Sequence, residues 1–205
     1  MAARPPIVLR DADREDAAAL ITLWRSAAET SRDEGLDPMA ASAMWREPGV
    51  AEAAAALELN LANPDKRIIV ALLDGEIVGA LMCDISTITP INLTRVLVVT
   101  ELQVLPKFRR KSVATTLLSA AANYGEEFNC EVVATLAPAH AREPNRFLTK
   151  LGFSQVSVVR VAQASMLRSK LSTKATNSRD TGKMIAVRRT LRRRQLESRK
   201  LRPRP

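Results

Sequence analysis

Apolar and polar residues alternate in two different ways along the chain, and the first part has the period of helices. Ile7 to Arg10 forms a short apolar stretch, which Asp11 and Asp13 follow as candidate helix N-caps. A helix is predicted over residues 15–28, because three apolar side chains recur on one face at helical spacing: Leu20, Leu23 and Trp24.

Alanine dominates the next stretch, residues 39–62, which Asp37-Pro38 opens and Asn63-Pro64 ends. Pro48-Gly49 interrupts the pattern, so two helices are predicted there.

The pattern then changes to that of β-strands. Residues 67–73 and 77–85 are predicted to pair as a hairpin, because Asp74-Gly75 between them is a two-residue turn sequence. A third strand is predicted over 94–105. Strict alternation would place five of its side chains on one face: Val96, Val98, Thr100, Leu102 and Val104.

Helices and strands alternate in the remainder. Helices are predicted over 110–128 and 142–151, the second closed by Gly152 as its C-cap. Strands are predicted over 131–136, 156–161 and 184–191, with a long polar excursion over 163–182. This order of elements is that of an α+β or mixed α/β fold.

The net charge of +9 suggests a polyanion partner, but the whole excess of positive charge lies at one end of the chain. The last 23 residues, 183–205, hold ten Lys or Arg and one Glu, so residues 1–182 hold 21 basic and 21 acidic residues. A basic arm of this kind either is solvated or contacts nucleic acid or the ribosome through phosphates. We therefore predict one domain over 1–191 and a basic, disordered tail over 192–205.

Cysteine usage and apolar runs indicate a cytoplasmic protein. Cys83 and Cys130 both lie in apolar settings, and one histidine cannot complete a metal site with them, so we expect reduced thiols and no metal. The charged N-terminus leaves no room for a signal peptide, and no apolar run is long enough to span a membrane.

Residues 104–118 join an apolar strand to a Leu-rich helix through a basic turn that contains Lys107, Arg109, Arg110 and Lys111. The free N–H groups of a first helical turn, together with about half a positive charge from the helix dipole, favour an anion at such a junction. A solvated helix start gives the same pattern, so the turn by itself leaves both interpretations open.

Four segments resemble the GNAT superfamily of N-acetyltransferases. Residues 109–114, RRKSVA, resemble its Q/R-x-x-G-x-G/A signature. Residues 7–20, 69–79 and 145–153 are similar, in order and spacing, to its first strand and helix, its second hairpin, and its Asn-containing helix that ends in Leu-Gly-Phe. The resemblance covers residues 7–161. It implies a central, twisted, mostly antiparallel sheet of six or seven strands flanked by about four helices.

The resemblance implies acetyl-CoA as co-substrate. Its pyrophosphate would lie on the backbone of Arg109, Arg110, Lys111, Ser112, Val113 and Ala114. Its pantetheine arm would pair with the strand end formed by Leu102, Gln103 and Val104, where the Val104 N–H would stabilise the oxyanion. Asn145 would contact the cofactor arm or, alternatively, cap its helix.

Two positions depart from the family pattern. Ser112 replaces the usual glycine, and we expect its side chain to narrow the approach of phosphate and weaken cofactor binding. Leu148 stands where the family often has the tyrosine that protonates the departing thiolate. The one tyrosine, Tyr124, lies on the preceding helix and is expected to pack in the core. A missing general acid costs roughly 10²- to 10⁴-fold in rate.

A general base is needed if the acceptor is an ammonium. The candidates are Glu101, on the opposite face of its strand from Leu102 and Val104, and His140, after the strand that ends near Leu136. A surface carboxylate and an incidental loop histidine are the alternative interpretations.

Two functions follow from these residues. The first is an acetyl-CoA-dependent N-acetyltransferase, an acyltransferase that transfers the acetyl group directly to an amine of a small molecule or protein. The second is a non-catalytic acyl-CoA-binding module that docks on nucleic acid or the ribosome through residues 183–205.

Overall fold

The computed structural model of the protein describes residues 5–33, 45–139 and 141–172. The chain divides into two compact units, Met1–Val159 and Arg160–Pro205. The first unit holds a sheet and its helices, and the described part of the second unit holds a helix over 164–172. The predicted strand over 184–191 and the predicted tail over 192–205 lie outside the described residues. Most of the first of the two helices predicted in the alanine-rich stretch also lies outside them.

Five strands form one sheet in the order β1-β2-β3-β4-β5. Every neighbouring pair is antiparallel except β4 and β5, which are parallel. The strands are β1 (Val8–Asp11), β2 (Lys66–Leu73), β3 (Glu76–Thr87), β4 (Arg95–Val104) and β5 (Val132–Thr135). The result is the predicted mixed α+β fold, with the DG turn joining β2 to β3.

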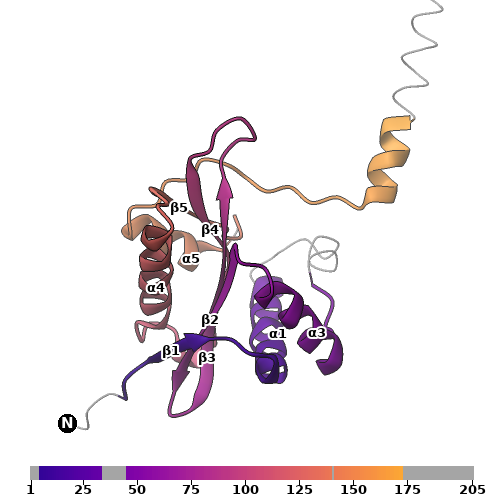
Figure 1. Ribbon diagram of the computed structural model, residues 1–205. Coiled ribbons are helices and arrows are strands. Elements are labelled where there is room, and N and C mark those ends of the chain that lie inside the picture. The colour runs from indigo at the N-terminus through magenta and orange to yellow at the C-terminus, as the bar shows by residue number, and fades with distance from the viewer. Residues whose placement is uncertain (1–4, 34–44, 140, 173–205) are drawn as a thin grey trace, which may run out of the picture. The chain divides into compact units, whose positions relative to one another are not determined.

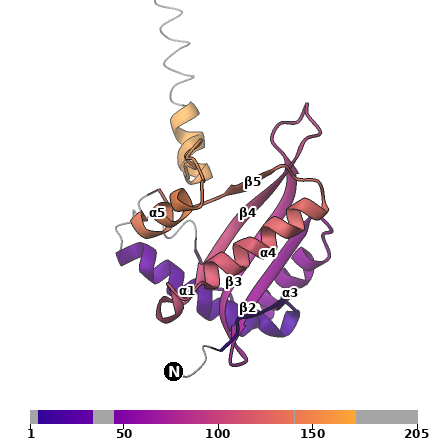
Figure 2. The same ribbon diagram turned by 90° about the vertical axis from the view of Figure 1, so that its left-hand side faces the viewer.

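Helices cover both faces of this sheet. Figure 1 shows α1 (Ala17–Asp33) and α3 (Val50–Leu61) on one face, with α4 (Val113–Glu127) and α5 (Arg142–Lys150) on the other. Figure 2 views the sheet from this second face, and α4 lies in front of the strands. Two short 3-10 helices, η1 (Arg14–Asp16) and η2 (Pro106–Phe108), precede α1 and α4.

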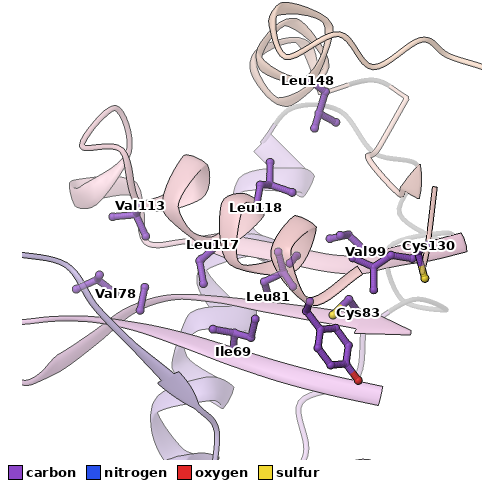
Figure 3. Packing of buried hydrophobic residues seen from close by; sticks show 14 of the residues in the cluster. Ile69, Val78, Leu81, Cys83, Val99, Val113, Leu117, Leu118, Cys130 and Leu148 are labelled. Carbon is purple, nitrogen blue, oxygen red and sulfur yellow. The ribbon is translucent and has the colours of Figure 1, made fainter. Parts of the chain in front are cut away.

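Two apolar clusters hold these layers together. On the α4 face, Leu81, Leu97 and Val99 of the sheet pack against Leu117 of α4 and Leu148 of α5 (Figure 3). On the opposite face, side chains of α1 and α3 pack on β2 and β3, among them Leu20, Leu23, Leu57, Ile68 and Val70. The sheet is therefore buried on both sides, which explains the near-continuous apolar runs of its central strands.

Local sequence signals account for the element ends. Asp13 caps η1: its carboxylate accepts from the Glu15 N–H at 2.9 Å, while the Asp16 carboxylate accepts from the Asp13 N–H at 2.9 Å. Gly152 closes α5 with a φ of 93°, and the N–H of Phe153 donates to Leu148 O at 3.1 Å. The predicted N-cap at Asp13 and C-cap at Gly152 are confirmed.

The described residues form a five-stranded sheet, fewer strands than the predicted six or seven. Residues 156–161 were predicted as a strand from their valines, but they form no strand, and Val156 is 92% exposed. The predicted polar excursion over 163–182 is also wrong in part, because 164–172 is helical. Alternating valines favour an extended chain, yet a strand needs a neighbour, and these residues have none in the sheet.

The predicted face of the β4 side chains is wrong for half of the strand. Met82 pairs with Glu101 while Cys83 pairs with Val99, so Thr100 is an extra residue in β4. This bulge shifts the alternation: Leu97 and Val99 share the α4 face with Leu102 and Val104. Strict alternation had grouped Val96 and Val98 with them instead.

Gly79 on β3 lets the start of α4 lie close to the sheet. A Cβ at this position would lie 2.8 Å from Val113 Cγ1 and 3.0 Å from the backbone oxygen of Gln103. We expect Gly79→Ala to lower the free energy of unfolding by about 1–3 kcal/mol, because the backbone atom cannot move aside cheaply. Urea denaturation measures this difference. The matched control is Gly49→Ser at the N-cap of α3, where a Cβ meets nothing within 4 Å. An unchanged midpoint for Gly79→Ala would contradict the close approach.

Candidate functional site

The strands β4 and β5 part near the middle of β4. Their paired residues run from Val96–Val132 to Val99–Thr135, and one further bond joins the Leu136 N–H to Val99 O at 3.0 Å. Beyond Val99, β4 continues to Val104 with β3 as its partner. Within the residues that the structure describes, the edge of β4 over 100–104 therefore has no strand beside it.

Two backbone N–H groups point outward from this open edge. The Leu105 N–H donates to Val78 O of β3 at 3.0 Å. Since successive N–H groups of a strand point to opposite sides, the N–H groups of Val104 and Leu102 point away from β3. Their side chains pack toward α4. Of the predicted pantetheine-binding residues, Leu102 and Val104 thus present backbone groups, and not side chains, to the edge, whereas the N–H of Gln103 points toward β3.

The open edge leads to the N-terminus of α4. The N-cap residue is Ser112, with φ 66° and ψ 3°, and its hydroxyl makes no capping hydrogen bond. Ser112 O accepts from the Thr116 N–H at 2.9 Å, which starts the helix. In the described part of the chain, the N–H groups of Lys111, Ser112, Val113 and Ala114 meet no acceptor with hydrogen-bond geometry. Four adjacent free donors at a helix start form a cradle for an anion.

Cations surround this cradle. The ammonium nitrogens of Lys107 and Lys111 lie 4.9 and 4.8 Å from the centroid of the Phe108 ring, so one aromatic ring holds two lysines beside the loop. Arg109 is exposed and, within the described residues, forms no ion pair. Lys107, Arg109 and Lys111 leave three positive charges available to a ligand.

Arg110 differs from its neighbours. Its Nη2 lies 2.5 Å from Glu143 Oε1 of α5, and both side chains are exposed. Its φ of 61° is left-handed, like that of Ser112. The pair ties the loop to α5 and offsets the charge of Arg110, so this residue adds less positive potential than the sequence pattern predicts.

Glu101 lies on the face of the sheet that α1 and α3 cover. It is directly opposite Met82, which packs into the cluster beneath those helices. Burial raises the pKa of the Glu101 carboxyl above its ordinary value, and a hydrogen bond from Gln103 Nε2 to Glu101 Oε2, 3.0 Å long, opposes the rise. The predicted separation of Glu101 from Leu102 and Val104 is present, and the side chain of Gln103 lies with Glu101.

Asn145 lies inside α5 and does not cap it, because the N-cap residue is Ala141. Its Nδ2 donates to Pro138 O at 2.8 Å and to Ala141 O at 2.7 Å. These bonds use both amide hydrogens to hold the loop between β5 and α5. Only the side-chain oxygen remains to contact a ligand.

Leu148 is buried in the α4-face cluster, where Figure 3 shows it pointing from its helix into the core. Tyr124 lies in the same cluster, as predicted, with its hydroxyl 3.5 Å from Pro64 O and its ring under the Arg67 guanidinium. Neither supplies an acid at the open edge. His140 lies outside the described residues, so its predicted role remains a prediction.

The structure brings together the strand end, the basic loop and the start of α4 that the sequence predicted, with Glu101 on the opposite face. Sequence reasoning missed three contributors: Phe108, Glu143 and the bulge residue Thr100. The position of Phe108 between lysines in the sequence was a usable signal. Nothing local indicated Glu143, because its partner Arg110 lies 33 positions earlier.

Comparison with known families agrees with this geometry. The model of the acetyltransferase (GNAT) family matches residues 23–153, which is more than half of the chain. The protein therefore belongs to the GNAT acetyltransferase family. A search of curated protein sequences found no significant match.

Solved structures share the fold at low sequence identity. The aminoglycoside N-acetyltransferase AAC(6')-Iy in complex with CoA is 18% identical, with a TM-score of 0.61 over 80% of this chain and 97% of that chain. Glucosamine-6-phosphate N-acetyltransferase from Arabidopsis thaliana is 15% identical, with a TM-score of 0.59 over 78% and 99%. A putative acetyltransferase from Agrobacterium tumefaciens is 22% identical, with a TM-score of 0.61 over 76% and 99%.

Across 5–33, 45–139 and 141–172, no group of three His, Cys, Asp or Glu side chains is arranged to hold a metal ion. No helix in the same ranges is long and apolar enough to cross a membrane.

The left-handed backbone of Ser112 gives a direct test of the loop. A Cβ in this conformation costs roughly 1–2 kcal/mol, which glycine avoids while losing some entropy on folding. We expect Ser112→Gly to raise the free energy of unfolding by about 1 kcal/mol in urea denaturation. Ser112→Ala, which removes the hydroxyl but keeps the Cβ, is the matched control and should not gain. Equal stability of the two variants would contradict a left-handed Ser112.

Proposed function

We propose that the protein is an acetyl-CoA-dependent N-acetyltransferase that transfers the acetyl group directly to an amine. The observation that carries the proposal is the continuity of an open β4 edge with a start of α4 whose amides are free and flanked by unpaired cations. An extended amide-containing arm that ends in a diphosphate matches both parts. Family membership supports the same co-substrate.

Each part of the site fits one part of acetyl-CoA. The free N–H groups of Lys111 to Ala114 and the cations Lys107, Arg109 and Lys111 would hold the phosphates. The edge groups of Leu102 and Val104 would pair with the pantetheine amides. Acetyl-CoA supplies an activated thioester, and the Val104 N–H would donate to its carbonyl oxygen as negative charge develops there.

Glu101 is the proposed general base. Its carboxylate would accept the proton that the acceptor ammonium must lose before the nitrogen can attack. A carboxyl pKa raised by burial brings the base closer to neutral pH, which improves proton transfer. Leu148 offers no proton to the departing sulfur, so the thiolate, with an ordinary pKa near 8.5, must take its proton from water.

A second function, binding of acyl-CoA without catalysis, is supported by two residues. Leu148 at the usual acid position and Ser112 at the usual glycine position both favour an acyl-CoA-binding module without catalysis. Release of free thiol from acetyl-CoA, measured with a panel of amines, separates the two functions. Tight CoA binding with no amine-dependent release would leave the binding module and overturn the enzyme.

The charges of the loop should control CoA affinity. We expect the double variant Arg109→Glu, Lys111→Glu to weaken CoA binding at least tenfold by titration calorimetry, because it replaces two phosphate-attracting charges with repelling ones. Arg110→Gln should have a smaller effect, since Glu143 already offsets that charge. Arg95→Glu, at the opposite end of β4, is the control. Unchanged affinity in the double variant would place the phosphates elsewhere.

The raised pKa of Glu101 predicts a pH-dependent stability. The folded protein keeps the Glu101 carboxyl protonated at pH values above its pKa in the unfolded chain, near 4.5. The wild type therefore loses stability as the pH rises from there through the raised pKa of the folded state. The stability of Glu101→Gln relative to the wild type should therefore increase as the pH is raised from 4 to 7, as measured by denaturant titrations.

The exposed Glu126→Gln variant controls for loss of one negative charge. As the general base, Glu101 should also give kcat/KM an acidic limb that Glu101→Gln lacks. A stability difference that stays constant with pH would argue against a buried, ionisable Glu101.

A further inference from the structure

An apolar cavity that is open to solvent on one side lies between α1, α3 and the sheet, on the face opposite α4. Its volume is about 270 Å³. The indole rings of Trp24 and Trp45 line it together with Leu20, Leu57, Ile68 and Met82. Among the described residues at its wall the polar side chain is Asn60, and its Nδ2 donates to Ala56 O at 2.9 Å. The cavity therefore offers no charge to a ligand.

The cavity lies close to the proposed general base, although Glu101 is not part of its wall. Ile68 on β2 pairs with Met82 on β3, and Met82 pairs with Glu101 on β4, so the three residues form one row across the sheet. Directly opposite residues of antiparallel strands share a face, with Cβ atoms about 5 Å apart. Ile68 and Met82 form the cavity floor, and the Glu101 carboxyl is the next group in that row.

We infer that this cavity binds the apolar part of the acceptor, so that the acceptor class is a small primary amine with one aromatic or branched-alkyl group. The inference rests on the proposed function. The apolar group would lie between the indole rings, and the ammonium would extend past Met82 to the Glu101 carboxylate. This orientation places the nitrogen beside β4, where the thioester carbonyl would meet the Val104 N–H.

The cavity disfavours polyhydroxylated or multiply charged amines. Apart from Asn60 Oδ1, the side chains of this wall offer no acceptor, so a further hydroxyl or ammonium held against them would lose water without gaining a hydrogen-bond partner, at a cost of about 1–3 kcal/mol for each neutral group. The size agrees with a small ligand, because ligand pockets span roughly 300–1,000 Å³ and the volume of this one falls just below that range.

Binding of 2-phenylethylamine to the CoA-saturated full-length protein tests the inference. We expect measurable binding by titration calorimetry, with kanamycin and ethanolamine at least tenfold weaker. The variant Ala56→Phe should weaken 2-phenylethylamine binding at least tenfold, because Ala56 lines the cavity from α3. Ala55→Phe is the matched control: Ala55 and Ala56 are both exposed on α3, but Ala55 is not part of the wall. Both variants should bind CoA like the wild type.

The outcomes separate this inference from the proposed function. CoA binding without 2-phenylethylamine binding would overturn the apolar acceptor and leave the transferase standing. Equal affinity for kanamycin, or equal losses in Ala55→Phe and Ala56→Phe, would also overturn it. Binding of 2-phenylethylamine to a protein that fails to bind CoA would overturn the proposed function and leave the amine site.

Discussion

The site depends on one constraint, which is that β4 has two strand neighbours at its start and one at its end. Up to Val99 its backbone is paired on both sides, and beyond Thr100 one side is open. Backbone donors that no strand satisfies gain most from a ligand that supplies acceptors in an extended line. The Thr100 bulge occurs at the same point and turns Glu101 to the α1 face while Leu102 and Val104 face α4. One irregular residue thus separates the proposed proton acceptor from the proposed cofactor edge.

Much of the fold could be predicted because its signals are local. The Asp13 cap, the Asp74-Gly75 turn and the Gly152 closure each act within a few residues, and the structure contains all three. The strand predicted over 156–161 depended on something that is not local. Its valines have the propensity for an extended chain, but pairing requires a free neighbour at the right distance, and propensity carries no information about that.

The site was predictable in position and less so in detail. The residues of the basic loop identify where an anion would bind, since charge and helix start are both visible in the sequence. The pairing of Arg110 with Glu143 depends on how α5 packs, and the left-handed Ser112 depends on how the loop closes. The faces of β4 required the bulge at Thr100. Alternation is a rule with period two, so one extra residue reverses every assignment on one side of it.

The chemistry that the site can perform depends on which of its side chains can exchange protons and on where they lie. The buried Leu148 has no ionisable group, so it cannot protonate a thiolate at the open edge. In the proposed reaction, catalysis would then come from backbone donors and positioning, which together are worth several powers of ten without any proton transfer. In the proposed reaction, the apolar cavity near Glu101 would add to this, because apolar neighbours leave a carboxylate less hydrated and make it a stronger proton acceptor. The burial that raises the pKa of the Glu101 carboxyl in the folded protein would in this way help it to act as the base.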